Sequence, residues 1–387
     1  MKIVKHILIL NNGSSSVKFA VFALGQNSVN QMKLSGAITR DQQDTILSWQ
    51  QGNKKQKVNY HTNYNLKNTW EYIFDLVKDF DISKIGVRMV HGGEKFVSTT
   101  RVDREFLRQI IKYNDLAPLH NPDAVALIKL VKKTWPQIKI AVSFDTAWYD
   151  DLSPAAYLYS LPHQYYQQYG IRKFGFHGLS HEAATNYAAE SLNKKLNKLK
   201  IITCHLGSGS SLTWYMDGKV LDTTMGFSPN EGLTMATRSG DIPADIVLYL
   251  ASKFKIKLKK IQHILSQESG LYGLCGLSDL RDVLVASGFR VAGYKTKRKF
   301  NAQQRKQAKL ALEIYLYDIR RYLASYVGMS KKLDAIVFTG KVGVKSAIIR
   351  RLSLKNINLP NNCRVIIAPE REMTNLANKT QACLKKK

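Results

Sequence analysis

Two apolar runs, each followed by a Gly/Ser turn and a second strand-like run, lie half a chain length apart and constrain the fold more than any other feature. The first spans residues 7–22 around Gly13, and the second spans residues 201–214 around Gly207. Apolar runs bounded by Gly and Ser are typical of buried strands, and the alternation in residues 17–22 suits the returning strand of a hairpin. A repeat at this interval indicates a duplicated chain. We therefore predict two α/β halves that face a cleft.

Further strands and helices alternate along the chain. Apolar runs predict strands at residues 85–90, 138–144, 335–339 and 364–367, and a period near 3.6 predicts helices at 106–113, 124–133, 181–191 and 301–329. This alternation is typical of the α/β class. The Pro-, Asp- and Tyr-rich stretch 148–162 is the candidate crossing point between domains. We predict one domain over residues 1–148 and another over residues 149–387, with the final segment able to pack back on the first.

Length and composition restrict the class of protein. The 387 residues, 44% of them hydrophobic, exceed the roughly 250–300 residues that one core usually supports, which also indicates two domains. The apolar runs are far shorter than the roughly 18 residues of a membrane-spanning helix, and the N-terminus lacks the apolar region of a signal peptide. The four scattered cysteines argue against a disulfide framework or a cysteine-based zinc site. We expect a cytoplasmic protein with reduced thiols and no membrane partner.

The chain is strongly basic, with 58 Lys and Arg against 29 Asp and Glu and a formal net charge of +29. Such a balance suits a polyanionic partner when the charge is gathered in one patch. The basic residues instead recur in separate short runs, at 194–200, 253–260, 295–299 and 385–387, with no recognised nucleic-acid-binding signature. Dispersed solvated faces therefore explain the charge better than nucleic-acid binding, which is the least favoured alternative.

The two Gly/Ser turns have the composition of phosphate-binding loops. Glycine lets the backbone approach an anion closely, and backbone N–H groups and serine hydroxyls can donate to it. Either turn alone would more simply be a serine-rich hairpin. Their repetition, with Asn11 and His205 near the ends of the preceding strands, favours two loops that hold the phosphates of one nucleotide.

Eight ordered blocks of sequence resemble the acetokinase family of the acetate and sugar kinase/Hsp70/actin superfamily. They are NNGSSSVK (11–18), GVRMVHGGEKF (86–96), APLHNP (117–122), FDTA (144–147), GFHGLSH (175–181), CHLGSG (204–209), DTTMG (222–226) and TRSGD (237–241). The resemblance runs from about residue 7 to about residue 370, so it is far more specific than one Gly-rich turn. It implies two duplicated actin-like (ribonuclease H-like) α/β domains around a central cleft, with the acyl substrate on the first domain and the nucleotide on the second.

The resemblance also implies an activity. The family's enzymes are acetate kinases, transferases that form acetyl phosphate and ADP from acetate and ATP by direct in-line attack, reversibly and with Mg²⁺, for which Mn²⁺ can substitute. They serve acetyl-CoA biosynthesis. Family members are homodimers whose domains close over the substrate, so we expect a homodimer here, and closure would exclude water from the transfer.

Five residues in these blocks are candidates for phosphoryl transfer. The planar guanidinium groups of Arg88 and Arg238 suit a carboxylate and a transferring phosphoryl group. Gly and Pro neighbours can aim the imidazoles of His120 and His177 into a cleft, and Asp145 follows a strand at the edge where α/β sheets bind ligands. From the residues alone each can also be structural, Asp145 for example as a helix N-cap. The resemblance implies substrate and transition-state roles for the arginines, phosphoryl contacts for the histidines, and orientation of Mg²⁺ through water for Asp145.

The remaining site residues are expected from the resemblance alone. A small acetate pocket would be lined by Arg88, Val90, Leu119, Phe176 and Pro229. The nucleotide would be bound by Lys18, His205, Gly207, Ser208, Gly209, Asp279, Arg281, Gly340 and Gly343. The metal would be held by Asn11 and by Glu372, which follows the position of the family's Mg²⁺-linked Glu, occupied here by Arg371. His181 is expected only to pack or to support its neighbours.

The acyl side is kept, whereas the nucleotide side departs from the family pattern. The family's FTGGIGEN reads FTGKVGVK at residues 338–345, which places Lys341 where a Gly lets the backbone approach the nucleotide. In the acyl pocket one methylene changes the free energy of discrimination between substrates by only about 1–3 kcal/mol, so propionate remains an alternative second substrate. Two alternatives therefore remain beside ATP-dependent acetate kinase. One is a relative that uses pyrophosphate or prefers propionate, and the other is a catalytically weak paralogue that binds ligand without turnover.

Overall fold

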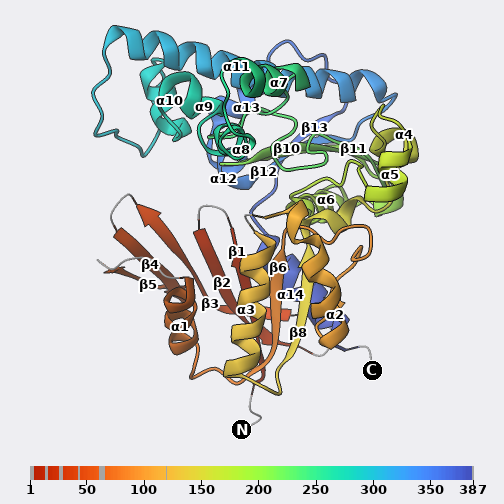
Figure 1. The fold of residues 1–387 in the computed structure, drawn as a ribbon. Coiled ribbons are helices and arrows are strands. Elements are labelled where there is room, and N and C mark those ends of the chain that lie inside the picture. Colours follow the sequence, from red (N-terminus) through yellow and green to blue (C-terminus); the bar gives the residue numbers. More distant parts are fainter. Residues whose placement is uncertain are drawn as a thin grey trace. The chain divides into compact units, whose positions relative to one another are not determined.

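The computed structural model describes residues 4–13, 16–25, 29–41, 44–60, 66–118 and 120–385. It divides into two units, each with its own sheet and hydrophobic core (Figure 1). Unit 1 is formed by Met1–Asp150 together with Arg371–Lys387, and unit 2 by Asp151–Glu370. The chain passes from unit 1 to unit 2 after Asp150 and returns to unit 1 after Glu370.

Unit 1 is built on an eight-stranded sheet in the order β5-β4-β3-β2-β1-β6-β8-β7. Strands β1 and β2 form the predicted hairpin, and β6 and β8 continue the sheet in parallel to β1. The strands are β1 (His6–Asn12), β2 (Ser16–Leu24), β3 (Val29–Asp41), β4 (Asp44–Gln51), β5 (Lys54–Tyr60), β6 (Ile82–Met89), β7 (Thr100–Arg101) and β8 (Lys139–Phe144). The helices are α1 (Leu66–Leu76), α2 (Arg104–Ile110), η1 (Ile111–Leu116), α3 (Asn121–Thr134), η2 (Asp145–Tyr149) and α14 (Glu372–Cys383).

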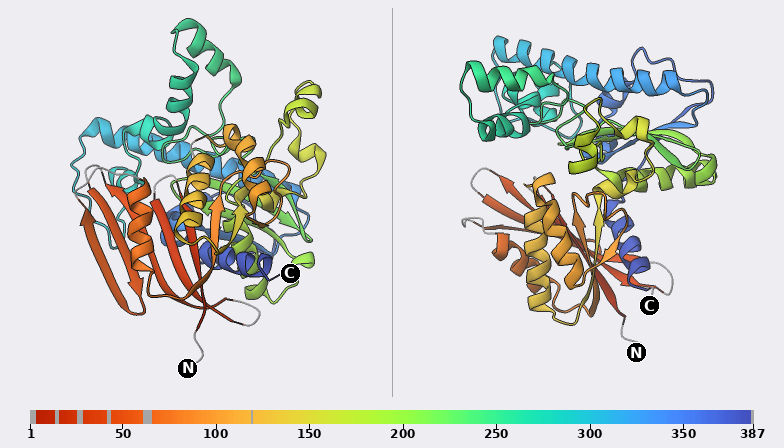
Figure 2. Two further views of the ribbon diagram at one scale, coloured as in Figure 1. Left: turned by 60° about the horizontal axis from the view of Figure 1, so that its bottom comes forward. Right: turned by 45° about the vertical axis from the view of Figure 1, so that its right-hand side comes forward.

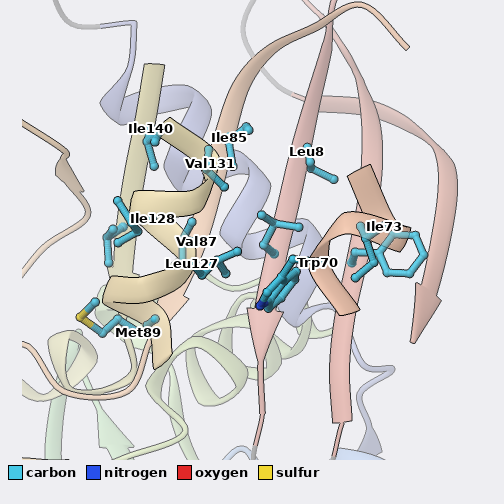
Figure 3. Packing of buried hydrophobic residues seen from close by; sticks show 14 of the residues in the cluster. Leu8, Trp70, Ile73, Ile85, Val87, Met89, Leu127, Ile128, Val131 and Ile140 are labelled. Carbon is cyan, nitrogen blue, oxygen red and sulfur yellow. The ribbon is translucent and has the colours of Figure 1, made fainter. Parts of the chain in front are cut away.

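Helices cover both faces of this sheet. On one face, Trp70 of α1 and Ile128 of α3 pack in one cluster with strand residues such as Leu8 and Val87 (Figure 3). On the other face, α14 packs against β1, β6 and β8 (Figures 1 and 2). A Cβ atom at Gly86 would lie 2.3 Å from Thr380 Oγ1 of α14, so glycine is what permits this close approach of helix and strand.

Unit 2 repeats the central topology of unit 1. Its sheet has the order β11-β10-β9-β12-β13, with β9 and β10 antiparallel and β12 and β13 parallel to β9 and to each other. This is the arrangement of β3-β2-β1-β6-β8, so the duplication inferred from the two Gly/Ser turns is confirmed. The strands are β9 (Lys200–Leu206), β10 (Ser210–Met216), β11 (Lys219–Thr223), β12 (Ala335–Thr339) and β13 (Arg364–Ile367).

Several helices of unit 2 pack against this sheet. The helices of this unit are α4 (Pro154–Tyr157), α5 (Gln164–Tyr169), α6 (Gly178–Leu192), η3 (Leu196–Lys198), α7 (Ala244–Lys253), α8 (Leu258–Gln267), α9 (Gly270–Cys275), α10 (Leu280–Ala286), α11 (Ala302–Met329), α12 (Gly340–Lys345) and α13 (Ala347–Ser353). The longest, α11, begins at a capping box in which the side chains of Asn301 and Gln304 each accept from the other's backbone N–H. Its buried face, which includes Leu312 and Ile319, packs into the core of unit 2.

Most elements expected from periodicity are present. Helices α3, α6 and α11 and strands β6, β8, β12 and β13 correspond to predicted segments. The helix expected at 106–113 ends as an α-helix at Ile110 and continues as the 3₁₀ helix η1. No disulfide joins the four cysteines, all of which lie in the described part of the chain. Within that part, no helix combines the length and apolarity that crossing a membrane requires.

Candidate functional site

In unit 1, the predicted residues gather where three neighbouring parallel strands end. Asn11 of β1 pairs in register with Arg88 of β6, and Asp145 follows the last residue of β8 directly. Glu372, the first residue of α14, comes from the far end of the chain to the same place, where its Oε1 accepts from Asn11 Nδ2 at 2.9 Å. The carboxyl edge of a parallel sheet is where ligands bind in open α/β folds.

A bidentate pair between Arg88 and Asp145 organises this cluster. Arg88 Nε donates to Asp145 Oδ1 at 2.8 Å, Arg88 Nη2 donates to Asp145 Oδ2, and Arg88 Nη1 donates to Asn11 Oδ1 at 3.1 Å. Asp145 is only 2% exposed, and Glu372 Oε1 lies 3.7 Å from Arg88 Nε. Burial would lower the pKa of Arg88, but the charges of Asp145 and Glu372 and the hydrogen bonds to Asp145 outweigh it and raise the pKa. Arg88 is therefore a permanent cation, and the Asp145 carboxylate binds it rather than capping a helix.

The same cluster has the chemistry of a magnesium site. It offers two carboxylates, from Asp145 and Glu372, and the amide oxygen of Asn11, and Mg²⁺ prefers such oxygen ligands. Within the described residues, no group of three or more His, Cys, Asp and Glu side chains is suited to hold a metal ion. Mg²⁺ usually keeps several waters and is bound through one or two carboxylates and substrate phosphates, and the carboxylates of Asp145 and Glu372 suit that mode of binding.

The other predicted residues of unit 1 lie around this edge. Val90 directly follows β6 and is buried. His120 is the N-cap residue of α3 and is partly exposed. Lys18 lies directly opposite Asn11 in the β1/β2 hairpin, so the two side chains leave the same face of the sheet. Leu119 falls outside the described residues.

His91 is a buried residue of this region that the sequence reasoning did not select. Its Nδ1 accepts from Gly93 N–H at 2.9 Å, and its backbone exchanges hydrogen bonds with the side chain of Asn121. Burial lowers the pKa of His91 to about 3. A proton on Nδ1 would also break the bond from Gly93, so the folded protein keeps this imidazole neutral.

Acid should therefore destabilise the protein through His91. The unfolded chain binds a proton at this residue below pH ~6.5, whereas the folded chain does so only near pH 3, so the stability falls as the pH drops between these values. We expect the free energy of unfolding to be about 1.4 kcal/mol lower at pH 5.5 than at pH 7.5 from this residue alone. Urea denaturation at both pH values should show a smaller difference in His91→Asn. Replacing the exposed His163 by Asn is the control, and identical pH dependence in all three proteins would contradict the expectation.

In unit 2, His177 and the second Gly/Ser turn lie together. His177 is the N-cap of α6 and has a φ of 58°, a left-handed conformation that costs a non-glycine residue energy and is often found at functional sites. Its ring stacks on that of His205 with centroids 4.3 Å apart. A Cβ atom at Gly209 would lie 3.1 Å from His177 Cε1 and Nε2, so the lack of a side chain at Gly209 leaves room for the imidazole.

Arg238 lies near the same turn. The Gly209 Cβ position is also 3.7 Å from Arg238 Nη1, which donates to the backbone oxygen of Pro229 at 3.2 Å. Gly207 N–H donates to Gly209 O within the turn. The structure therefore brings together, within unit 2, His177, Arg238, Pro229 and the turn at residues 207–209. Phe176, the remaining pocket candidate of this unit, directly precedes His177 and is buried.

The expected adenosine side centres on α10 and α12. Asp279 caps α10 by accepting from Arg281 N–H at 2.9 Å and also pairs with the Arg281 guanidinium. Burial would raise the pKa of Asp279, but the bonds from Arg281 and the charges of Arg281 and Lys341 lower it. The charge of Lys341, exposed on α12, thus acts on Asp279, one of the two residues expected beside the ribose and adenine. The neighbouring Gly340 has a φ of 75°, and Gly343 is buried in the same helix.

Comparison with known proteins gives the family. The sequence pattern of the acetokinase family matches residues 6–380. The acetate kinase of Bacillus cytotoxicus is 37% identical over 364 residues, covering 91% of this chain and 86% of its own. The acetate kinase of Halothermothrix orenii is 35% identical over 369 residues, with 91% and 88% covered.

Solved structures agree with the sequence relatives. A propionate kinase from Francisella tularensis has a TM-score of 0.85 at 31% identity, covering 98% of this chain and 99% of its own. The Porphyromonas gingivalis acetate kinase has a TM-score of 0.82 at 27% identity, covering 98% of this chain and all of its own. The expected actin-like α/β fold is thereby confirmed, and the chain belongs to the acetokinase family.

Proposed function

We propose that this protein is an acetate kinase, which transfers the terminal phosphoryl group of ATP reversibly to acetate. The observation that carries the proposal is the buried Arg88–Asp145 pair with Asn11 and Glu372 at the carboxyl edge of the unit 1 sheet. It occurs in a chain that matches the acetokinase family over residues 6–380 and relatives named acetate kinase over 91% of its length.

In this reaction an acetate oxygen attacks the terminal phosphorus as the bond to the ADP oxygen breaks, so no protein nucleophile is needed. Arg88 would bind the carboxylate with its remaining N–H group on Nη2, since a guanidinium has five and four are donated to Asp145, Asn11 and the backbone oxygen of Asn12. Because Asp145 accepts from two N–H groups along one edge of the guanidinium, the orientation of the guanidinium is set before the substrate arrives. Arg238 and His177 would stabilise the charge on the equatorial phosphoryl oxygens.

Mg²⁺, when held by Asn11, Asp145 and Glu372, would neutralise phosphate charge. Glu372 is the preferred carboxylate because Asn11 binds it directly, whereas Arg371 is the residue before α14. The acyl group would be limited by Val90, Phe176 and Pro229.

A colorimetric hydroxamate assay tests the proposal directly. Purified protein is incubated with Mg²⁺ and every pairing of ATP or pyrophosphate with acetate or propionate. The proposal expects the highest kcat/KM with ATP and acetate. The absence of acyl phosphate with all four pairings would contradict a kinase altogether, and a preference for pyrophosphate or propionate would favour the corresponding relative.

The charge of Lys341 gives a specific reason to include pyrophosphate as a second donor. Lys341 acts on Asp279, beside which the adenosine is expected. We expect Lys341→Gly to lower KM for ATP about tenfold, because this glycine would let the nucleotide approach the backbone. Lys345→Gly, on the same helix, is the matched control. A rise in KM for ATP in Lys341→Gly would mean that the ammonium binds the donor's phosphates instead.

We also propose that the protein is a homodimer. Helix α7 and the segment after it carry several exposed apolar side chains: Ile246 (43% exposed), Leu248 (64%), Tyr249 (56%), Phe254 (60%) and Leu258 (70%). Burial of such a face would stabilise a dimer. Light scattering should give twice the chain mass, and Leu248→Glu should yield monomers, whereas Leu310→Glu, at an exposed site on α11, should not.

A further inference from the structure

A continuous chain of side-chain hydrogen bonds connects His177 to the interior of unit 2. Ser211 Oγ of β10 lies 2.9 Å from His177 Nδ1 and 2.8 Å from His181 Nε2. His181 Nδ1 lies 2.6 Å from Thr203 Oγ1 of β9, and Thr203 Oγ1 is 3.4 Å from the backbone oxygen of Thr213. His181, Thr203 and Ser211 are all fully buried, so water does not compete for these bonds.

The direction of the chain follows from its inner end. The Thr203 hydroxyl donates its single proton to Thr213 O at 3.4 Å, and with that proton used, Thr203 Oγ1 accepts from His181 Nδ1–H. Burial and, to a smaller extent, the neighbouring His205 hold the pKa of His181 well below its ordinary value. A neutral imidazole with its proton on Nδ1 leaves a lone pair on Nε2, which accepts from the Ser211 hydroxyl.

The outer end then follows. Once Ser211 has donated its only proton to His181, its oxygen can only accept from His177, which requires a proton on His177 Nδ1. We propose that Ser211 and His181 are positioning residues that keep a proton on His177 Nδ1. Nε2 of His177, which lies beside Gly209, is then the nitrogen that faces the phosphoryl group and takes up or releases a proton. This inference rests on the proposed function, because it concerns how His177 acts in that reaction.

Fixing the tautomer has a chemical consequence. With Nδ1–H already bound, His177 can donate to a phosphoryl oxygen only from a protonated Nε2, that is, as an imidazolium. The charged groups around it are the stacked ring of His205, the guanidinium of Arg238 across Gly209, and His181 through Ser211. An arriving phosphate anion would oppose the charge of Arg238 and favour the charged form of His177.

The tautomer can be measured without substrate. Histidine labelled with ¹⁵N is read by NMR at alkaline pH, where free imidazole is neutral, and the His177 signals are assigned by their loss in His177→Asn. We expect a protonated Nδ1 and an unprotonated Nε2 in the unaltered chain. In His181→Phe the Ser211 hydroxyl loses its acceptor and turns to His177, so the proton should move to Nε2. An unaltered chain protonated on Nε2, or His181→Phe protonated on Nδ1, would overturn the proposal.

Kinetics and matched variants separate positioning from a general structural effect. We expect kcat to fall about 10²-fold in His181→Phe and 10–10²-fold in Ser211→Ala, with KM for acetate and ATP changed less than about threefold. His181→Gln keeps an acceptor for Ser211 and should retain the His177 tautomer and most of the activity. This variant also tests the hydrogen-bond chain if His181→Phe does not fold. The control is Ser210→Ala, whose hydroxyl contacts Tyr315 and should affect neither readout. Loss of kcat in His181→Gln equal to that in His181→Phe would overturn the proposal.

The proposed function and this proposal fail differently. A protein that forms no acyl phosphate but shows the expected tautomers refutes the kinase and supports the hydrogen-bond chain. An active kinase whose His177 is protonated on Nε2 refutes the chain and leaves the kinase in place.

Discussion

Replacing Arg238 by alanine should lower kcat for acetyl phosphate formation about 10³-fold or more. Arg238 Nη1 donates to Pro229 O, and the side chain lies beside the turn at residues 207–209. Its planar guanidinium group can there bind a phosphoryl group as negative charge develops on the phosphoryl oxygens. Arginines that stabilise a phosphoryl transition state are worth about 10³–10⁵-fold. Because this interaction strengthens in the transition state, kcat should fall far more than KM for acetate rises, as steady-state hydroxamate assays would show.

Two further variants define what is lost. Arg238→Lys keeps the positive charge but lacks the two parallel N–H donors of a guanidinium group, so it should recover only part of the rate. Arg172 also lies in unit 2, but its guanidinium covers the Tyr157 ring at 3.8 Å, and Arg172→Ala should keep kcat within about twofold. A kcat for Arg238→Ala within tenfold of the unaltered enzyme would remove Arg238 from the proposed mechanism.

Replacing Asp145 by alanine should both abolish most activity and destabilise unit 1. The change leaves the Arg88 guanidinium mostly buried without its bidentate partner, since the Arg88 side chain is only 13% exposed. Breaking a buried pair in this way typically costs 3–5 kcal/mol, so we expect a loss of about 3 kcal/mol or more in the free energy of unfolding. Urea denaturation, together with hydrogen exchange of the β6 and β8 amides, measures this loss within unit 1.

An exposed pair of the same unit provides the comparison. Glu105 pairs with Arg108 in α2, with side chains 54% and 69% exposed. Exposed pairs contribute little to stability because solvent screens them, so Glu105→Ala should change the free energy of unfolding and kcat little. Equal stability losses in Asp145→Ala and Glu105→Ala would show that the Arg88–Asp145 pair is not the buried anchor described above.

The parts of the fold that sequence predicts well are those with strong local patterns. The two turns at Gly13 and Gly207 predicted the duplication, and the long periodic stretch before Met329 predicted α11 almost to the residue. Buried strands such as β12 are continuous apolar runs, which is the pattern of a strand covered on both faces. Here local sequence and tertiary packing favour the same structure.

Other elements have no such local signal. Strands β3, β4 and β5 extend the sheet of unit 1, but the Lys- and Gln-rich β5 is an edge strand whose polar residues read as a loop. The contact of Glu372 with Asn11 joins opposite ends of the chain, and the link between His177 and His181 passes through Ser211 on another strand. Such contacts depend on which strands become neighbours, which no window of sequence contains.

The place of α14 in unit 1 has a consequence for how this protein can be made. Gly86 leaves room for a helix that the ribosome produces only after unit 2, and Glu372 belongs to that helix. Domains usually fold in the order of synthesis, but unit 1 would complete its fold only after unit 2 has been translated, because α14 packs on one face of its sheet. A gene cut after residue 150 would therefore yield an incomplete unit 1, whereas a permuted chain that joins residues 371–387 to residues 1–150 would contain all of its parts.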